Sequence, residues 1–306
     1  LSEELSYFGK ASHDADLDRD DDGRLNVFFT ANQVSAGVAG FFNFADFLPA
    51  SDAQSSGNES DILWVVAPGV GDATTAGAMG TLVHEYTHLA SYGIRVYGNS
   101  SAPLREELWL DESLAHTMED LMGWGVTNIR AVEQALGEWD STGFASLRDS
   151  VAMRGMGYTL IRYLLDRKGA EAGASSVTDS NAISAAKTAV TALVNGAPSG
   201  FEHPFFQNAS ASDYGNWLLA LYAGGNEDVI SEAQKNGYLA VGSASTGHAI
   251  GFNPWGTFED SAEEEVELEG LSPEELDALP EDEEGELYVG GSVIYLITGL
   301  EPGSRV

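Results

Sequence analysis

The chain has no cysteine among its 306 residues. This absence excludes disulfide bonds, a thiol nucleophile and a zinc site built on thiolates. A chain of this length buries enough apolar surface to fold without disulfides. The lack of cysteine therefore leaves the compartment open.

Basic residues are also scarce, with 14 Lys and Arg against 48 Asp and Glu and a formal net charge of −34. Nucleic acid is not an expected partner, because binding to phosphates needs clustered Lys and Arg. We interpret the acidity as a source of solubility rather than as a preference for cationic substrates. No apolar run approaches the roughly 20 residues of a membrane-spanning helix, so no membrane span is expected.

The most informative motif is H-E-Y-T-H at residues 84–88. On a helix, His84 and His88 leave from one face, so both imidazoles can reach one ion. Glu85 lies about 100° round the helix from His84, near a water held by that ion. Two histidines and one carboxylate are a catalytic zinc set that keeps a position open for water. We therefore predict a zinc site on a partly buried helix.

The residues alone leave the third ligand open. Asp111 and Glu112 lie between apolar neighbours, which favours a helix that turns an acidic group inward. The candidate carboxylates are Glu106, Glu107, Asp111, Glu112, Glu119 and Asp120.

The segment W-L-D-E-S-L-A at residues 109–115 resembles a motif of the gluzincin (thermolysin-like) zinc metallopeptidases. Their second zinc helix carries W-L-N-E-G-[LF]-[AS], whose Glu binds zinc. The resemblance implies that Glu112 is the third ligand. Asp111 replaces the Asn, and we expect it to accept a hydrogen bond from a ligand histidine. His116 follows one turn after Glu112 on the same face, and we expect it to support the site from outside the ligand set.

Within the gluzincins, the closest resemblance is to the hyicolysin family of secreted bacterial peptidases. It extends over residues 20 to 225, through segments 22–30, 40–47, 58–64 and 157–167. The resemblance implies an α+β, zincin-like fold with a small N-terminal mixed sheet, the zinc helices and a mainly helical second subdomain. It also implies a secreted or cell-surface bacterial protein. Because Leu1 is not an initiator, we interpret the chain as a processed or truncated piece of a longer product.

The chain divides into three predicted parts: residues 1–125 with the sheet and zinc helices, 126–256 with a helical subdomain, and 257–306. The last part holds many of the acidic residues, and we interpret it as a solvated linker with one short helix after residues 272–275 and a β-hairpin within 287–297. Elsewhere we predict two strands, at 24–30 and 61–67. We predict zinc helices at 72–94 and from Glu107 to before Gly123 or Gly125. Further helices are expected at 128–136, with Asn128 as N-cap, and at 153–167, 182–194 and 212–223.

The expected reaction is hydrolysis of internal bonds in a protein or peptide substrate by a monomeric zinc endopeptidase. Zinc activates water, and Glu85 acts as general base. By resemblance, Ile62 to Ala67 form an edge strand to which the substrate adds. An exopeptidase is not favoured, because the G-x-M-E-N element of the aminopeptidase relatives is missing. Tyr158 is the first candidate for stabilising the oxyanion, and the alternatives are Arg154, His203 and His248.

Three other interpretations stay open. The first is a catalytically degenerate zincin-fold module that serves in binding or adhesion. The second comes from Asp18, Asp20, Asp22 and Gly23, which match the start of an EF-hand calcium loop. Phe29 occupies the position of the bidentate Glu, so the choice is between a solvated acidic turn and an irregular calcium site. This turn alone supports the second interpretation, a calcium-binding surface domain without zinc. The third interpretation is an inactive precursor in which residues 1–20 or the acidic tail cover the cleft.

Overall fold

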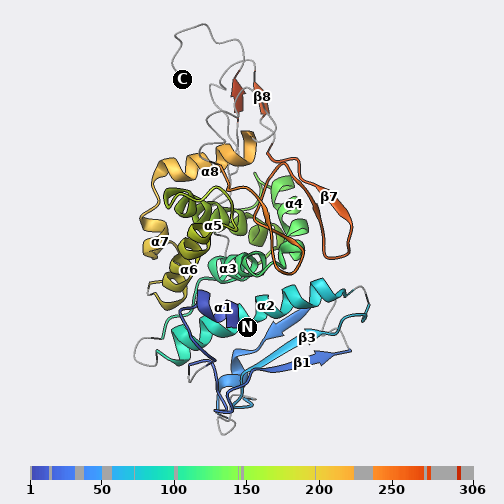
Figure 1. Cartoon of the computed structure of the whole chain (residues 1–306), viewed down its shortest axis with the longest axis vertical. Helices are drawn as coiled ribbons and strands as arrows, with labels where there is room; N and C mark the ends of the chain where they lie inside the picture. The colour runs from blue at the N-terminus through green and yellow to red at the C-terminus, as the bar shows by residue number, and fades with distance from the viewer. Residues whose placement is uncertain are drawn as a thin grey trace.

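The computed structural model describes most of the chain (Figure 1). The described residues are 2–13, 16–31, 38–49, 57–71, 73–99, 103–143, 145, 148–196, 198–223 and 237–271, with the backbone of two short strands at 274–276 and 295–297.

A three-stranded sheet forms the N-terminal part of the fold, in the order β1-β3-β2. β1 (Asn26–Thr30) and β3 (Ile62–Val66) are the two strands that the apolar segments predicted, and the structure pairs them in parallel. β2 (Gly40–Phe42) pairs antiparallel on the other side of β3. The expectation that Ile62 to Ala67 form an edge strand is therefore wrong, since β3 is central and β2 takes the edge.

Two helices follow the sheet and confirm the predicted pair. α2 (Thr75–Tyr92) starts at Thr74, whose hydroxyl accepts a hydrogen bond from the Gly77 amide, and it continues into a π-helical turn, η2 (Gly93–Tyr97). α3 (Leu108–Leu121) comes next. α2 lies between the sheet and α3 (Figure 1), so its faces contact both layers.

The C-terminal half of the described chain is mainly helical, and its four predicted helices are found. α5 (Val151–Glu171) is the central helix, with 15 of its 21 residues buried. The other elements are α1 (Ser2–Tyr7), η1 (Phe44–Phe47), η3 (Gly125–Thr127), α4 (Ile129–Gly137), α6 (Ser180–Asn195), η4 (Gly200–Glu202), α7 (Pro204–Gln207) and α8 (Ala211–Ala223).

Gly157 sets how closely α5 approaches α3. A Cβ at this position would overlap the side chain of Ser113 in α3. Ser113 directly follows Glu112 in α3. This close contact therefore fixes the position of α5 along its own axis relative to Glu112, the predicted third ligand.

Asn128 is the N-cap residue of α4, as predicted, and its carbonyl accepts from the Val132 amide at 2.9 Å, but its side chain does not cap the helix. Its side chain makes no capping bond and is 1 % exposed. It instead bonds to His116, accepting at Oδ1 (2.6 Å to Nδ1) and donating from Nδ2 to the His116 carbonyl (2.7 Å). The tertiary contact thus replaces the local cap.

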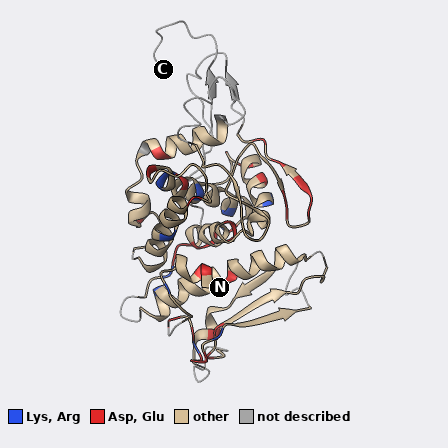
Figure 2. Ribbon diagram, in the orientation of Figure 1, with Lys and Arg blue, Asp and Glu red and all other residues tan. Residues whose placement is uncertain are grey.

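Part of the predicted acidic linker belongs to the folded body. Val266, Leu268 and Leu271 are buried in the main core, and β6 (Thr257–Glu259) pairs antiparallel with β7 (Glu265–Glu267). Glutamates alternate with these apolar residues and face outward, which colours the hairpin red in Figure 2. The linker prediction is wrong for residues 259–271. The high density of acidic residues there obscured the alternation of buried apolar and exposed acidic side chains that is typical of a strand.

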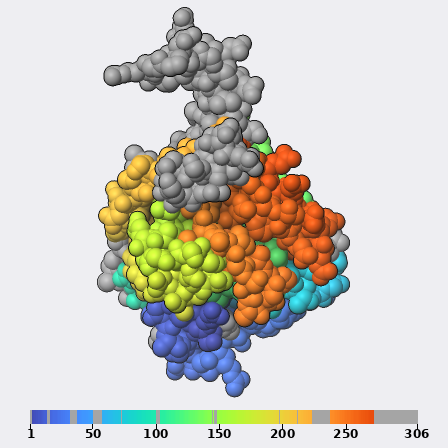
Figure 3. Space-filling view, turned by 45° about the horizontal axis from the view of Figure 1, so that its top comes forward, coloured from blue at the N-terminus to red at the C-terminus, as the bar shows by residue number. Residues whose placement is uncertain are grey.

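Two further short strands, β4 (Gly242–Ser243) and β5 (Ala249–Ile250), precede this hairpin. Residues 237–271 cover a broad part of the face seen in Figure 3, in orange and red beside the yellow-green helices.

The end of the chain also differs from its prediction. β8 (Glu274–Leu276) is a strand where a short helix was expected, and it pairs in parallel with β9 (Tyr295–Ile297). The predicted first hairpin strand, residues 287–289, lies outside the described residues.

One main hydrophobic core draws on both halves of the described chain, with Leu63, Tyr86 and Leu89 from the first and Met153 and Leu160 from the second. The α+β class is confirmed by this mixture of small sheets and helices. No helix in the described ranges combines the length and apolarity needed to cross a membrane.

Candidate metal centre

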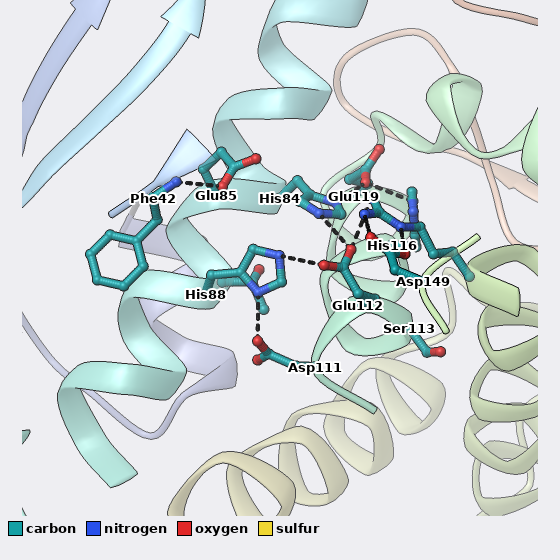
Figure 4. Close-up of polar contacts among 12 residues, drawn as sticks. Phe42, His84, Glu85, His88, Asp111, Glu112, Ser113, His116, Glu119 and Asp149 are labelled. Atoms are coloured by element: carbon teal, nitrogen blue, oxygen red, sulfur yellow. Dashed lines mark hydrogen bonds and ion pairs between the residues drawn. The ribbon is translucent and has the colours of Figure 1, made fainter. Parts of the chain in front are cut away.

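His84, His88 and Glu112 converge between α2 and α3 (Figure 4). His84 Nε2 lies 3.4 Å from Glu112 Oε2, and His88 Nε2 lies 3.8 Å from Glu112 Oε1. The two imidazole rings stand 4.8 Å apart at 77°. The i, i+4 spacing on α2 produces this pair, and α3 brings the carboxylate from outside the motif. These three side chains form a group that can hold a metal ion.

The electrostatics of this group favour a cation. Burial alone would lower the pKa of His84, but the neighbouring carboxylates of Glu112 and Glu119 outweigh it and raise the pKa to about 10. Burial would also lower the pKa of His88, and Asp111 raises it. Burial would raise the pKa of Glu112, but His84, His88 and Arg154 lower it to about 2. Glu112, and Glu119 whose pKa is also lowered, therefore stay ionised and need a positive charge, which a proton or a metal ion supplies.

Each histidine of the group is held at its other ring nitrogen by a carboxylate. His84 Nδ1 lies 2.7 Å from Glu119 Oε1, and His88 Nδ1 lies 3.0 Å from Asp111 Oδ2. This leaves both Nε2 atoms directed toward Glu112, as carboxylate–histidine–metal arrangements require. The position of Asp111 agrees with its prediction. Glu119 was expected only as a candidate ligand, although it lies two turns after Glu112 on the same face of α3.

Glu119 is shared with a second histidine. His116 Nδ1 lies 2.9 Å from Glu119 Oε1, and its ring packs edge-on to that of His84 at 4.8 Å. Glu119 Oε2 also accepts a hydrogen bond from the Thr127 hydroxyl. His84, His116 and Glu119 form a second group that can hold a metal ion, with His84 common to both groups.

A cavity of about 420 Å³ opens at this centre. Glu85 lies on its β2 side, and Glu85 Oε2 accepts a hydrogen bond of 2.7 Å from the amide of Phe42. The lining residues are 38–42, Thr81, His84, Glu85, His88, Glu112, His116, Glu119, Thr127 and Arg154. The cavity therefore joins the edge strand, the two zinc helices predicted from the sequence, and α5.

Of the four candidates for stabilising an oxyanion, only Arg154 lines this cavity. Tyr158 is 3 % exposed and lies beside Asp120 and Arg162 in the core. It lines a different cavity, so the prediction that it stabilises the oxyanion does not fit its position. His203 is buried and contacts the Ala192 carbonyl at 2.9 Å. His248 packs on Trp124.

Asp18, Asp20 and Asp22 lie together, as the acidic loop predicted, and form a third group that can hold a cation. Asp18 accepts from the amides of Asp22 (3.1 Å) and Gly23 (2.8 Å). Asp20 Oδ2 accepts from the Ser60 hydroxyl at 2.6 Å. These bonds account for much of the loop's shape, and calcium binding here stays a prediction.

The donor set fits zinc. Two neutral imidazole nitrogens and one carboxylate oxygen are ligands that zinc accepts in tetrahedral geometry. Glu112 Oε2 is buried and has no hydrogen bond to a described residue, although charged groups lie beside it. A buried carboxylate oxygen in this state is an atom that a cation satisfies.

Comparisons of the chain with protein-family models, with curated proteins and with solved structures found no match. The function is therefore inferred from the residues and their geometry.

We expect Glu119→Gln to weaken zinc binding by roughly 10- to 100-fold, the usual cost of removing an outer partner of a ligand histidine. Glutamine keeps the size but no longer holds His84 and His116 with a negative charge. Competition with a chromophoric chelator measures the affinity. Glu133→Gln is the control, because Glu133 is half exposed on α4. Equal zinc affinity in Glu119→Gln and the unmodified protein would remove Glu119 from the metal centre.

Proposed function

We propose that the protein is a zinc-dependent endopeptidase of the gluzincin type that hydrolyses internal bonds of proteins or peptides. One observation carries the proposal: His84, His88 and Glu112 converge in the same cavity that Glu85 lines. A zincin-like fold is part of the proposal, supported by the order of sheet, first zinc helix, second zinc helix and helical half.

His84 Nε2, His88 Nε2 and a carboxylate oxygen of Glu112 would hold the zinc. When bound there, zinc lowers the pKa of a coordinated water and polarises the scissile carbonyl. Asp111 and Glu119 keep the ligand imidazoles oriented through their Nδ1 atoms.

Glu85 moves the proton. The Phe42 amide fixes Oε2, which leaves Oε1 to accept a proton from the attacking water. The water oxygen bonds to the carbonyl carbon, and the bond from that carbon to the amide nitrogen breaks. Glu85 then passes its proton to the leaving nitrogen, which gives a carboxylic acid and an amine. The proton of the acid moves to the amine, so the products are a carboxylate and an ammonium group.

The edge of β2 is the surface on which we expect the substrate to lie. The Val66 amide donates to the Ala39 carbonyl at 2.8 Å, so by alternation the amide and carbonyl of Gly40 point away from β3. Among the described residues no strand pairs with this side of β2, so an extended peptide can pair there, next to Glu85. A Cβ on Gly40 would approach Thr81 Cγ2 and the Trp64 carbonyl to 2.6 Å, so glycine lets β2 lie close to α2.

The test uses an internally quenched peptide library with both ends blocked, which only an endopeptidase cleaves. We expect cleavage that 1,10-phenanthroline abolishes and that added zinc restores. Zinc binding without any cleavage would favour the alternative, a degenerate binding or adhesion module. The presence of Glu85 among the residues that line the cavity favours the catalytic interpretation.

A further inference from the structure

Arg154 reaches the metal centre from α5 and lines the same cavity as Glu85. Its Nη1 lies 3.0 Å from Glu112 Oε2, one of the candidate ligand atoms. Figure 4 shows Glu85 and Asp149 on opposite sides of His84 and Glu112, and Arg154 bonds to Asp149.

Asp149 holds this guanidinium in a two-point clamp. Arg154 Nε donates to Asp149 Oδ1 at 2.7 Å, and Nη2 donates to Oδ2 at 2.6 Å. A fork of this kind fixes the plane of the group as well as its position. Ser150, the next residue, caps α5 through the Met153 amide (3.1 Å), which anchors the backbone beside Asp149.

The two hydrogen bonds to Asp149 leave the N–H donors of Arg154 Nη1 unused. Nη1 carries two N–H groups. Its contact with Glu112 Oε2 is an ion pair and not a hydrogen bond. Among the described residues no acceptor takes a hydrogen bond from Nη1. The group lines the cavity, and 29 % of its side chain is exposed. Arg154 thus offers fixed N–H donors and a permanent positive charge beside the ligands.

On the basis of the proposed function, we infer that Arg154 is a further catalytic residue, which stabilises the negative charge that develops on the scissile carbonyl oxygen, and that Asp149 is its positioning residue. When water attacks, the carbonyl π electrons move to oxygen, and the Nη1 donors meet that charge. Collapse of the same charge reforms the carbonyl as the bond to nitrogen breaks. Donors fixed in advance stabilise such charge without reorganisation.

The zinc-loaded full chain and its variants Arg154→Lys, Arg154→Gln and Asp149→Asn test this inference. With a blocked quenched peptide, we expect kcat of Arg154→Gln to fall about 10²- to 10³-fold, the usual cost of losing an oxyanion donor. KM should change by only a few-fold. Asp149→Asn should show a smaller loss, and Arg154→Lys should retain part of the rate because it keeps a charged donor.

Zinc affinity, measured by chelator competition, separates this role from support of Glu112. We expect the affinity to stay within about tenfold in all three variants, below the cost of losing a ligand. Free guanidinium ion should restore part of the kcat of Arg154→Gly. Arg130→Gln is the matched control, because Arg130 is clamped by Asp260 and Glu133 but does not line the cavity.

Unchanged kcat in Arg154→Gln, beside an active unmodified protein, would overturn this inference and leave the proposed function standing. Full recovery of the variant's rate by excess zinc would also overturn it, since Arg154 would then act only through metal affinity. An unmodified zinc-loaded protein that cleaves nothing would overturn both. If Arg154→Gln does not fold, the kcat values of Arg154→Lys and Asp149→Asn decide between these outcomes.

Discussion

Glu112→Gln should lose zinc by roughly 10³-fold or more in affinity, well above the 10- to 100-fold expected for an outer partner, and should lose peptide cleavage with it. Glu112 is the only ligand of the proposed set that comes from α3, and it faces both Nε2 atoms. Glutamine preserves the shape but brings a neutral oxygen or an N–H group to a position that needs an anion. Chelator competition and metal analysis after gel filtration measure the loss.

The fold should survive this substitution. The neighbouring core of α3 and α5 stays intact, so circular dichroism and the thermal midpoint of the metal-free protein should be close to those of the unmodified protein. Tight, stoichiometric zinc binding by a folded Glu112→Gln variant would show that another residue completes the site. Glu119 is the first replacement to consider, because it forms the second group with His84.

Glu85→Gln should have the opposite signature, with zinc retained and cleavage lost. The side chain bonds to the Phe42 amide rather than to the ligand histidines, so its loss removes no ligand. Removing a general base lowers rates by about 10²- to 10⁴-fold. Metal content and the rate on a blocked peptide, measured on the same sample, check both halves of this expectation.

The two variants make a matched pair, since each replaces one carboxylate of the same cavity by its amide. A difference between them in metal content, together with the loss of cleavage in both, distinguishes a ligand from a base. If Glu85→Gln cleaves as fast as the unmodified protein, Glu85 has no part in the chemistry. If it loses zinc as Glu112→Gln does, its role is structural.

The features that depend on local spacing could be predicted from the sequence. The pairing of His84 and His88 follows from one helical turn, and Thr74 starts that helix as its capping chemistry indicates. The choice of Glu112 needed the resemblance of its flanking residues, because six carboxylates follow the first motif. The contact between Asp111 and His88 agrees with the same resemblance.

Features that depend on how elements meet could not be predicted. Arg154 and Tyr158 lie one turn apart on α5, and only the axial position of that helix decides which one reaches the site. The close contact of Gly157 with Ser113 sets that position, and it places Tyr158 in the core. Helical periodicity shows which residues share a face of α5, but it does not show where α5 lies along its axis relative to α3.

The sheet and the acidic hairpin could not be predicted for other reasons. β2 is three residues long and contains Gly-Phe-Phe, too short to show an alternation, so the sequence gives no sign that it covers the edge of β3. In residues 257–271, the density of charge masks the alternation of Val266 and Leu268 with glutamates. The side chain of Arg130 bonds there to Asp260 at 2.8 Å and ties the hairpin to α4.

The central claim is that two imidazoles of α2 and one carboxylate of α3 hold a single zinc ion. A crystal of the protein grown with one equivalent of zinc, measured on both sides of the zinc absorption edge, tests it directly. We expect one strong anomalous peak at about 2.0–2.2 Å from His84 Nε2, His88 Nε2 and a Glu112 oxygen. A peak at Asp18, Asp20 and Asp22 alone, or no peak between α2 and α3, would contradict the claim.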